Sequence, residues 1–154
     1  MDDNAFWNIL AELDWSQSGD DEAVLEPSVD ALAALPLEEI YAFEELLARK
    51  LHALDTREVC RAVYVGELDP DDGDDYISAD DFLYSRCVVV ANGRESFENV
   101  LRDPSQAPSG LEFEALLSLA QTAYEQKTGK VYGYSTGVSW ESFSNADEIG
   151  RAHV

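Results

Sequence analysis

The sequence predicts a mainly α fold: a compact single-domain bundle of about six or seven helices over residues 1–130, followed by an irregular, aromatic C-terminal tail over residues 131–154. Apolar residues recur every three or four positions through most of the first part, and residues typical of helix ends flank these stretches. The chain has 154 residues, of which 45% are hydrophobic, and this is enough for one core.

The first helix is expected just after Asp2 and Asp3, whose carboxylates suit a helix N-terminus, with Trp7 docked in the core. The following stretch, residues 16–35, is less regular. Pro27 should break a continuous helix there, and Ser28 is a candidate cap for a second helix. We therefore expect two short helices, or a turn and one helix, in this region.

The strongest helical signal runs over residues 35–54. Pro36 suits a first helical turn, and the apolar residues after it recur on one face of a helix. These residues are Leu37, Ile40, Phe43, Leu47, Leu51 and Leu54. This stretch is predicted to be a core helix.

Two shorter helices should come next. Asp55 or Thr56 can cap the first of them, which Gly66 would end. Ser78, followed three residues later by Asp81, resembles a capping box and would open a helix that is apolar on most sides. That second helix should therefore sit centrally in the fold.

The last helical signals lie between residues 94 and 129. Residues 94–101 predict a short helix, and Ser109 with Glu112 suggests a second capping box that opens a helix ending at Gly129. Beyond Gly129 the chain is rich in Gly, Ser and aromatic residues and has no helical stripe. At most one or two strands are expected in this tail, which either packs on the domain or flanks it.

Charge is the outstanding feature of the composition. With 32 acidic and 10 basic residues, the formal net charge is −22. Nucleic acid and anionic membranes are poor partners for such a surface, because both require clusters of Lys and Arg. A basic protein is the natural electrostatic partner, although the charge could also serve solubility alone.

Two segments are candidate partner-binding surfaces. The first is a solvated acidic loop, in which Asp71, Asp72, Asp74 and Asp75 have no basic residue near them in sequence. The second is the aromatic tail, represented by Tyr134 and Trp140, which has the amphipathic composition of a recognition surface. The alternative for the tail is simple packing over the core.

No catalytic group, metal site or cofactor motif can be assembled from the sequence. Only His52 and His153 are present, so a histidine-based triad or zinc site is not expected. With Gly73 at the invariant glycine of a calcium loop, the first and last ligands would be Leu68 and Ala79, neither of which can bind the ion. Cys60 and Cys87 are predicted to be buried thiols in helices, although a thiolate nucleophile is not excluded.

Arg86 stands alone as a basic residue in an apolar helix. A buried guanidinium is expected to pair with a carboxylate, for which Asp80, Asp81 or a glutamate from another helix are candidates. A structural role is favoured over binding of an anion.

The opening MDDNAFWNILAELDW carries no basic leader and no long apolar run. Neither a signal peptide nor a membrane span is therefore expected, and we predict a cytoplasmic protein.

Several motifs occur together in order: Phe6-Trp7, LPLEEIYAF, DDFLYSR, NGRESFENVLRDP and AYEQKTG. In this combination the chain resembles an uncharacterised bacterial family known as domain of unknown function 4240, over about residues 5–130. The family pattern has an aromatic residue at Ser85 and a tryptophan at Cys87, where this sequence departs from it. The resemblance implies a small helical domain and carries no accepted activity or catalytic residues.

Three functions are open from the sequence. The first is a non-enzymatic protein-binding module, for example an immunity or antitoxin-like protein that covers a basic partner. The second is a DNA mimic that blocks a nucleic-acid-binding protein, which would need its acidic groups on one rigid face. The third is an enzyme that uses carboxylates or Cys87.

Overall fold

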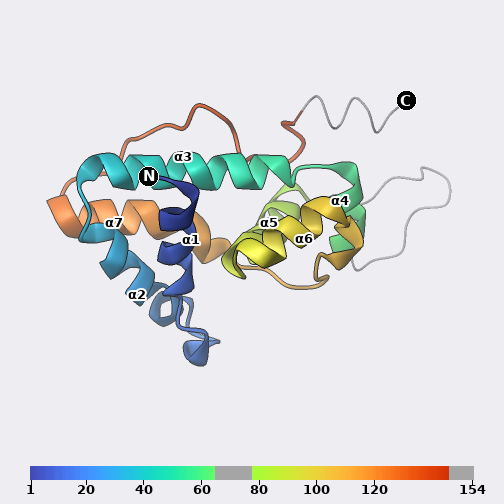
Figure 1. The fold of residues 1–154 in the computed structure, drawn as a ribbon, viewed down its shortest axis with the longest axis horizontal. Coiled ribbons are helices and arrows are strands. Elements are labelled where there is room, and N and C mark those ends of the chain that lie inside the picture. Colours follow the sequence, from blue (N-terminus) through green and yellow to red (C-terminus); the bar gives the residue numbers. More distant parts are fainter. Residues whose placement is uncertain (65–77, 146–154) are drawn as a thin grey trace. The chain divides into compact units, whose positions relative to one another are not determined.

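A computed structural model describes residues 1–64 and 78–145. These residues form seven α-helices and three short 3-10 helices, with no strand among them, so the predicted mainly α class is confirmed (Figure 1). The helices are α1 (Asp3–Ala11), α2 (Asp21–Ala33), α3 (Leu37–Ala53), α4 (Arg57–Val63), α5 (Ala79–Ala91), α6 (Arg94–Arg102) and α7 (Leu119–Thr128). The 3-10 helices are η1 (Trp15–Gln17), η2 (Pro104–Gln106) and η3 (Glu114–Ser118).

The contacts of the chain divide it into two compact units. Unit 1 consists of Met1–Ala48 and Glu114–Val138, and unit 2 consists of Arg49–Phe113 and the segment that begins at Ser139. Each unit is therefore built from two separate stretches of the chain, and α3 contributes to both. The segment that the sequence sets apart after residue 130 is likewise shared between them.

α1 begins at Asp2, whose carboxylate accepts a hydrogen bond from the Ala5 amide at 2.8 Å. Such a cap satisfies an amide that the first helical turn leaves without a partner. The apolar face of α1 is buried: Trp7 is docked as predicted, and the ring of Phe6 stacks on Phe43 of α3 with centroids 4.9 Å apart.

α2 is one continuous helix that contains Pro27, so the predicted break there is wrong. Proline removes one backbone hydrogen bond and costs about 3 kcal/mol in a helix interior. The helix continues because Val24 and Val29, before and after Pro27, are buried and the helix packs against α7. Ser28 does not cap a helix, and its buried hydroxyl instead donates to the Ile9 carbonyl at 2.7 Å.

α3 matches the strongest signal in the sequence. It starts one residue after Pro36, and the predicted stripe is fully buried at every position from Ile40 onward. The same side of the helix carries Glu44, which is only 4% exposed. A carboxylate therefore lies within a face that otherwise forms the core.

Both predicted caps in unit 2 are confirmed. The Thr56 hydroxyl accepts the Val59 amide at the start of α4, and the Ser78 hydroxyl accepts the Asp81 amide at the start of α5. α5 is buried on most sides, as its composition predicts. Cys60 and Cys87 are both buried thiols.

Gly93 precedes α6 with a φ of +104°, which favours glycine over residues that carry a Cβ atom. The helix buries Phe97 and Val100. Leu101 is 46% exposed because it stands about 100° further round the helix than Val100.

The capping box predicted over residues 109–112 is wrong. The backbone there bonds to α5 instead: the Leu111 carbonyl accepts the Ser85 hydroxyl, and the Phe113 amide donates to the Tyr84 carbonyl, both at 3.1 Å. These bonds hold the chain outside a helical conformation until η3 begins. The polar pattern of a capping box is short, and tertiary hydrogen bonds override it here.

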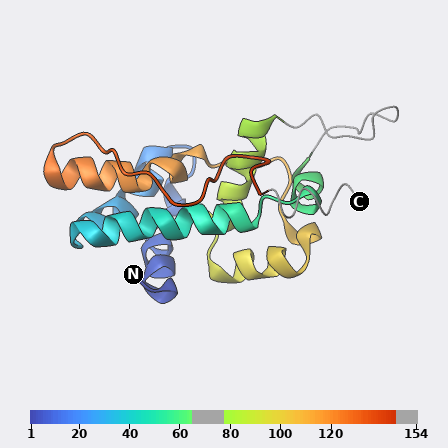
Figure 2. The ribbon, with the colours of Figure 1, turned by 90° about the horizontal axis from the view of Figure 1, so that it is seen from above.

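α7 ends as predicted, at Gly129 in the left-handed conformation. In unit 1 the chain then returns along α3, as the orange-to-red trace in Figure 2 shows. From residue 131 to 138, exposed and half-buried residues alternate, and none of them is fully buried. We call residues 131–138 the strap.

Candidate functional site

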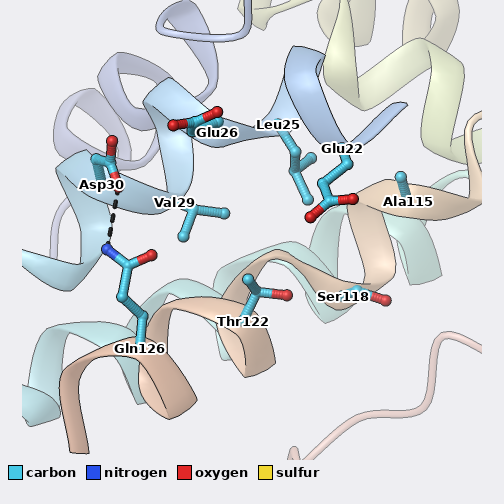
Figure 3. Close-up of a pocket in the computed structure, with 9 residues that line it drawn as sticks. All are labelled: Glu22, Leu25, Glu26, Val29, Asp30, Ala115, Ser118, Thr122 and Gln126. Atoms are coloured by element: carbon cyan, nitrogen blue, oxygen red, sulfur yellow. Dashed lines mark hydrogen bonds between the residues drawn. The ribbon is translucent and has the colours of Figure 1, made fainter. Parts of the chain in front are cut away.

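A groove lies between α2 and α7 in unit 1, with a volume of about 530 Å³ (Figure 3). One wall is acidic and comes from α2: Glu22, Glu26 and Asp30. The facing wall carries neutral polar side chains at the same spacing of four residues, which are Ser118, Thr122 and Gln126. Residues four apart on a helix share a face, so each wall is a straight row along its helix.

The floor of the groove is apolar, because Leu25 and Val29 are buried between the two walls. One end is closed by a hydrogen bond of 3.0 Å from the Gln126 amide to the Asp30 carboxylate (Figure 3). Glu22 and Glu26 remain exposed to solvent. No basic side chain is among the described residues that line the groove.

A second cluster in unit 1 contains four tyrosines. The ring of Tyr41 on α3 stacks on that of Tyr134 from the strap, with centroids 4.8 Å apart, and on that of Tyr132 at 6.4 Å. Tyr124 of α7 completes the cluster, 5.2 Å from Tyr132. Beside these rings, Glu45 of α3 accepts the Tyr134 hydroxyl at 2.8 Å.

Glu44 is the perturbed acid of this cluster. Burial raises the pKa of its carboxyl from 4.5 to about 7, and the negative charge of Glu45 adds to the rise, while the Tyr132 hydroxyl opposes part of it. Oε1 of Glu44 is buried and has no hydrogen-bond partner among the described residues. Burial and the charge of Glu44 in turn raise the pKa of Tyr132. Within the fold, Glu44 therefore holds its proton up to about neutral pH.

In unit 2, Arg86 is fully buried and acts as a structural clamp. Its guanidinium donates to the Leu51 carbonyl at 2.8 Å, and to the Trp140 carbonyl and the Ser142 hydroxyl, both at 2.9 Å. It also lies over the ring of Phe82, 4.6 Å from the centroid. The clamp joins the end of α3, the helix α5 and the C-terminal segment.

The predicted pairing of Arg86 with Asp80 or Asp81 is wrong. Both aspartates are exposed in the first turn of α5, whereas Arg86 points into the interior of unit 2 and is bonded there to carbonyl and hydroxyl oxygens. Burial lowers the pKa of the guanidinium, and the negative charge of Asp55 opposes this shift. The negative charge of Asp55 thus partly compensates the positive charge of Arg86 by coulombic attraction.

Asp55 also holds the C-terminal segment directly. Its carboxylate, 1% exposed, accepts the backbone amides of Phe143, Ser144 and Asn145 at 2.8 to 2.9 Å. Phe143 has a φ of +67°, which is strained for a residue other than glycine. The three hydrogen bonds, together with stacking of its ring on Phe82, maintain this conformation.

The candidate residues from the sequence fall in separate places. Asp71, Asp72, Asp74 and Asp75 lie outside the described residues. Tyr134 belongs to the tyrosine cluster of unit 1, and Trp140 belongs to unit 2, where its carbonyl contacts Arg86. Both aromatic side chains are half-buried.

Glu44, the role of Asp55 in holding the C-terminal segment, and the acidic wall of the groove were not predicted from the sequence. A signal for Glu44 was present, because it stands four residues after Ile40 and three before Leu47, on the apolar side of α3. The acidic wall also had a signal, since Glu22, Glu26 and Asp30 recur at helical spacing. The expected helix break at Pro27 hid that pattern.

In the described ranges 1–64 and 78–145, no group of three or more His, Cys, Asp or Glu side chains is arranged to hold a metal ion. None of the helices in this part of the chain is both long and apolar enough to cross a bilayer.

The family model described as "Protein of unknown function (DUF4240)" matches residues 1–126, and the chain belongs to this family. No curated protein and no solved structure matches the sequence.

Proposed function

We propose that this member of the DUF4240 family is a non-catalytic binding protein, and that the groove between α2 and α7 receives a basic segment of a partner protein. The observation that carries the proposal is the arrangement of three carboxylates at successive helical turns beside an apolar floor. An amphipathic segment with lysine or arginine at one-turn spacing would match both the charges and the floor.

The charge of the whole chain supports the same partner. A net charge of −22 attracts a cationic surface from a distance and raises the association rate, while the groove supplies a defined place of contact. Charge alone would favour every basic protein to a similar extent. The apolar floor is the part that distinguishes among them.

Within this class, we put an immunity or antitoxin-like role first, with a basic toxin or nuclease as the partner. Capture from native lysate at low ionic strength, with the wild-type protein and a groove variant as paired baits, tests this role. A basic or co-encoded protein retained by the wild type and lost by the variant is the expected result. Recovery of no such protein would count against the role, and a nucleic-acid-binding partner would favour the DNA mimic.

The groove variant combines Glu22→Gln, Glu26→Gln and Asp30→Asn. We expect this variant to bind a cationic helical probe peptide about tenfold more weakly than the wild type, because it keeps the shape of the groove but loses the charges of its wall. The probe has three lysines at one-turn spacing beside a leucine face. Fluorescence anisotropy titration of the labelled peptide measures the affinity.

A matched control removes the same number of charges from exposed positions outside the groove, with Glu12→Gln, Glu58→Gln and Glu95→Gln. We expect this control to bind the probe within about twofold of the wild type, since distant charges act only through a screened field. Equal losses in the two variants would show that the groove is not the docking site.

The acidic segment that contains Asp71, Asp72, Asp74 and Asp75 provides a separate test. Replacing these four residues by asparagine removes four like charges from one short segment, so the association rate with a basic partner should fall and depend less on salt. The dissociation rate should change little, because steering acts before contact. Stopped-flow binding at two ionic strengths measures both rates, and an unchanged association rate would leave the segment as a solubility feature.

A further inference from the structure

The side chain of Glu45 attaches the strap to α3. Its carboxylate accepts the Tyr134 hydroxyl and the Gly137 amide, at 2.8 and 2.6 Å. Ring stacking of Tyr132 and Tyr134 on Tyr41 adds further contacts. Because no strap residue is fully buried, lifting the strap exposes little apolar surface.

Glu44 lies under this attachment. It is 4% exposed, and its Oε1 and the hydroxyl of Tyr132 are both buried without a hydrogen bond of ordinary geometry to any described residue. A protonated carboxyl is neutral and tolerates this position. An ionised carboxylate would be buried without a compensating cation and next to the charge of Glu45.

We propose that the strap is a latch whose closed state requires a proton on Glu44. Loss of this proton opens the strap and uncovers Tyr41 on α3 and Tyr124 on α7. The strap has no fully buried residue, whereas α3 and α7 both have buried faces. Lifting it readmits water to the carboxylate while the helices keep their buried faces.

The titratable groups that act on Glu44 in the described structure are Glu45 on α3 and Tyr132 on the strap, one acidic and one neutral. The rings of Tyr41, Tyr124 and Tyr134 lie around that of Tyr132. Because the pKa of Glu44 is raised from 4.5 to about 7 in the closed form, closure is fully favoured below pH 4.5. That advantage is lost progressively as the pH rises through 7.

Hydrogen exchange of the Gly137 amide, corrected for its intrinsic pH dependence, tests the latch in the full-length protein. In the wild type, the population of the open strap should increase roughly 70-fold between pH 5 and pH 8, as the linkage between the two pKa values requires. In Glu44→Gln, which cannot ionise, the protection of Gly137 should not change with pH. Equal protection at both pH values in the wild type would overturn the latch.

Two variants distinguish opening of the strap on ionisation of Glu44 from a general loss of protection against hydrogen exchange. Glu12→Gln removes an exposed carboxylate that is distant from Glu44 in the sequence, and this variant should keep the wild-type pH response. Glu45→Gln removes the attachment and should lower the protection of Gly137 at both pH values, with a smaller response to pH, because the charge of Glu45 contributes to the raised pKa of Glu44. A pH response that persists in Glu44→Gln would also overturn the proposal.

If Glu44→Gln fails to fold, a titration of the wild type decides instead. The ¹³C shift of the Glu44 carboxyl should change with a midpoint near pH 7. A midpoint near 4.5 would show that the fold does not raise the pKa of Glu44, so that closure is not linked to its proton, and would exclude the latch.

Discussion

Replacing Arg86 by alanine is expected to lower the free energy of unfolding by about 3 to 5 kcal/mol. The side chain is 0% exposed, and its removal leaves the carbonyls of Leu51 and Trp140 without their donor. It also leaves a cavity over the ring of Phe82. Chemical denaturation at neutral pH, monitored by circular dichroism, measures the loss.

Two other substitutions serve as comparisons for Arg86→Ala. Arg86→Lys keeps the charge, but a single ammonium group cannot replace two separate guanidinium nitrogens, so we expect an intermediate loss of stability. Arg94→Ala removes an arginine whose ion pair with Glu98 is exposed, and should change the free energy of unfolding by less than about 1 kcal/mol. An Arg86→Ala midpoint equal to that of the wild type would contradict the clamp.

Leu47→Ala should cost about 2 to 5 kcal/mol, because Leu47 is 0% exposed at the middle of the buried stripe of α3. Truncation removes buried methyl groups and leaves a space that the surrounding helices fill only in part. The same denaturation experiment measures this loss.

Leu37→Ala is the matched comparison, since it makes the same chemical change in the first turn of the same helix at a half-buried position. We expect it to cost clearly less than Leu47→Ala, as less apolar surface leaves water there on folding. A loss below about 0.5 kcal/mol for Leu47→Ala would place this face of α3 outside the core.

Local signals in the sequence predicted the helices well. The stripe of α3 and the caps at Thr56 and Ser78 depend on residues only a few positions apart, so the sequence alone contains them. The errors at Pro27 and at residues 109–112 have the opposite origin. In both places a local preference is overridden by a distant segment. At Pro27 the override comes from packing of α2 on α7, and at residues 109–112 from hydrogen bonds to α5.

The candidate sites were less predictable for the same reason. Arg86 was recognised as buried, but its acceptors are backbone oxygens, and a carbonyl group carries no signature in the sequence. The perturbation of Glu44 depends on a strap almost 90 residues further along the chain, which covers it with Tyr132. Periodicity could place Glu44 on the inner face of α3, but could not show what lies above it.

The division of each unit into two stretches of chain has a consequence for synthesis. Unit 1 needs α7, against which α2 packs, and the ribosome adds α7 only after residues 49–113. At about 5 to 20 residues per second, the nascent N-terminal helices wait several seconds for this partner. Their apolar faces are exposed during that interval, when chaperones can bind them. Folding of unit 1 is therefore expected to finish only after α7 and the strap have been made.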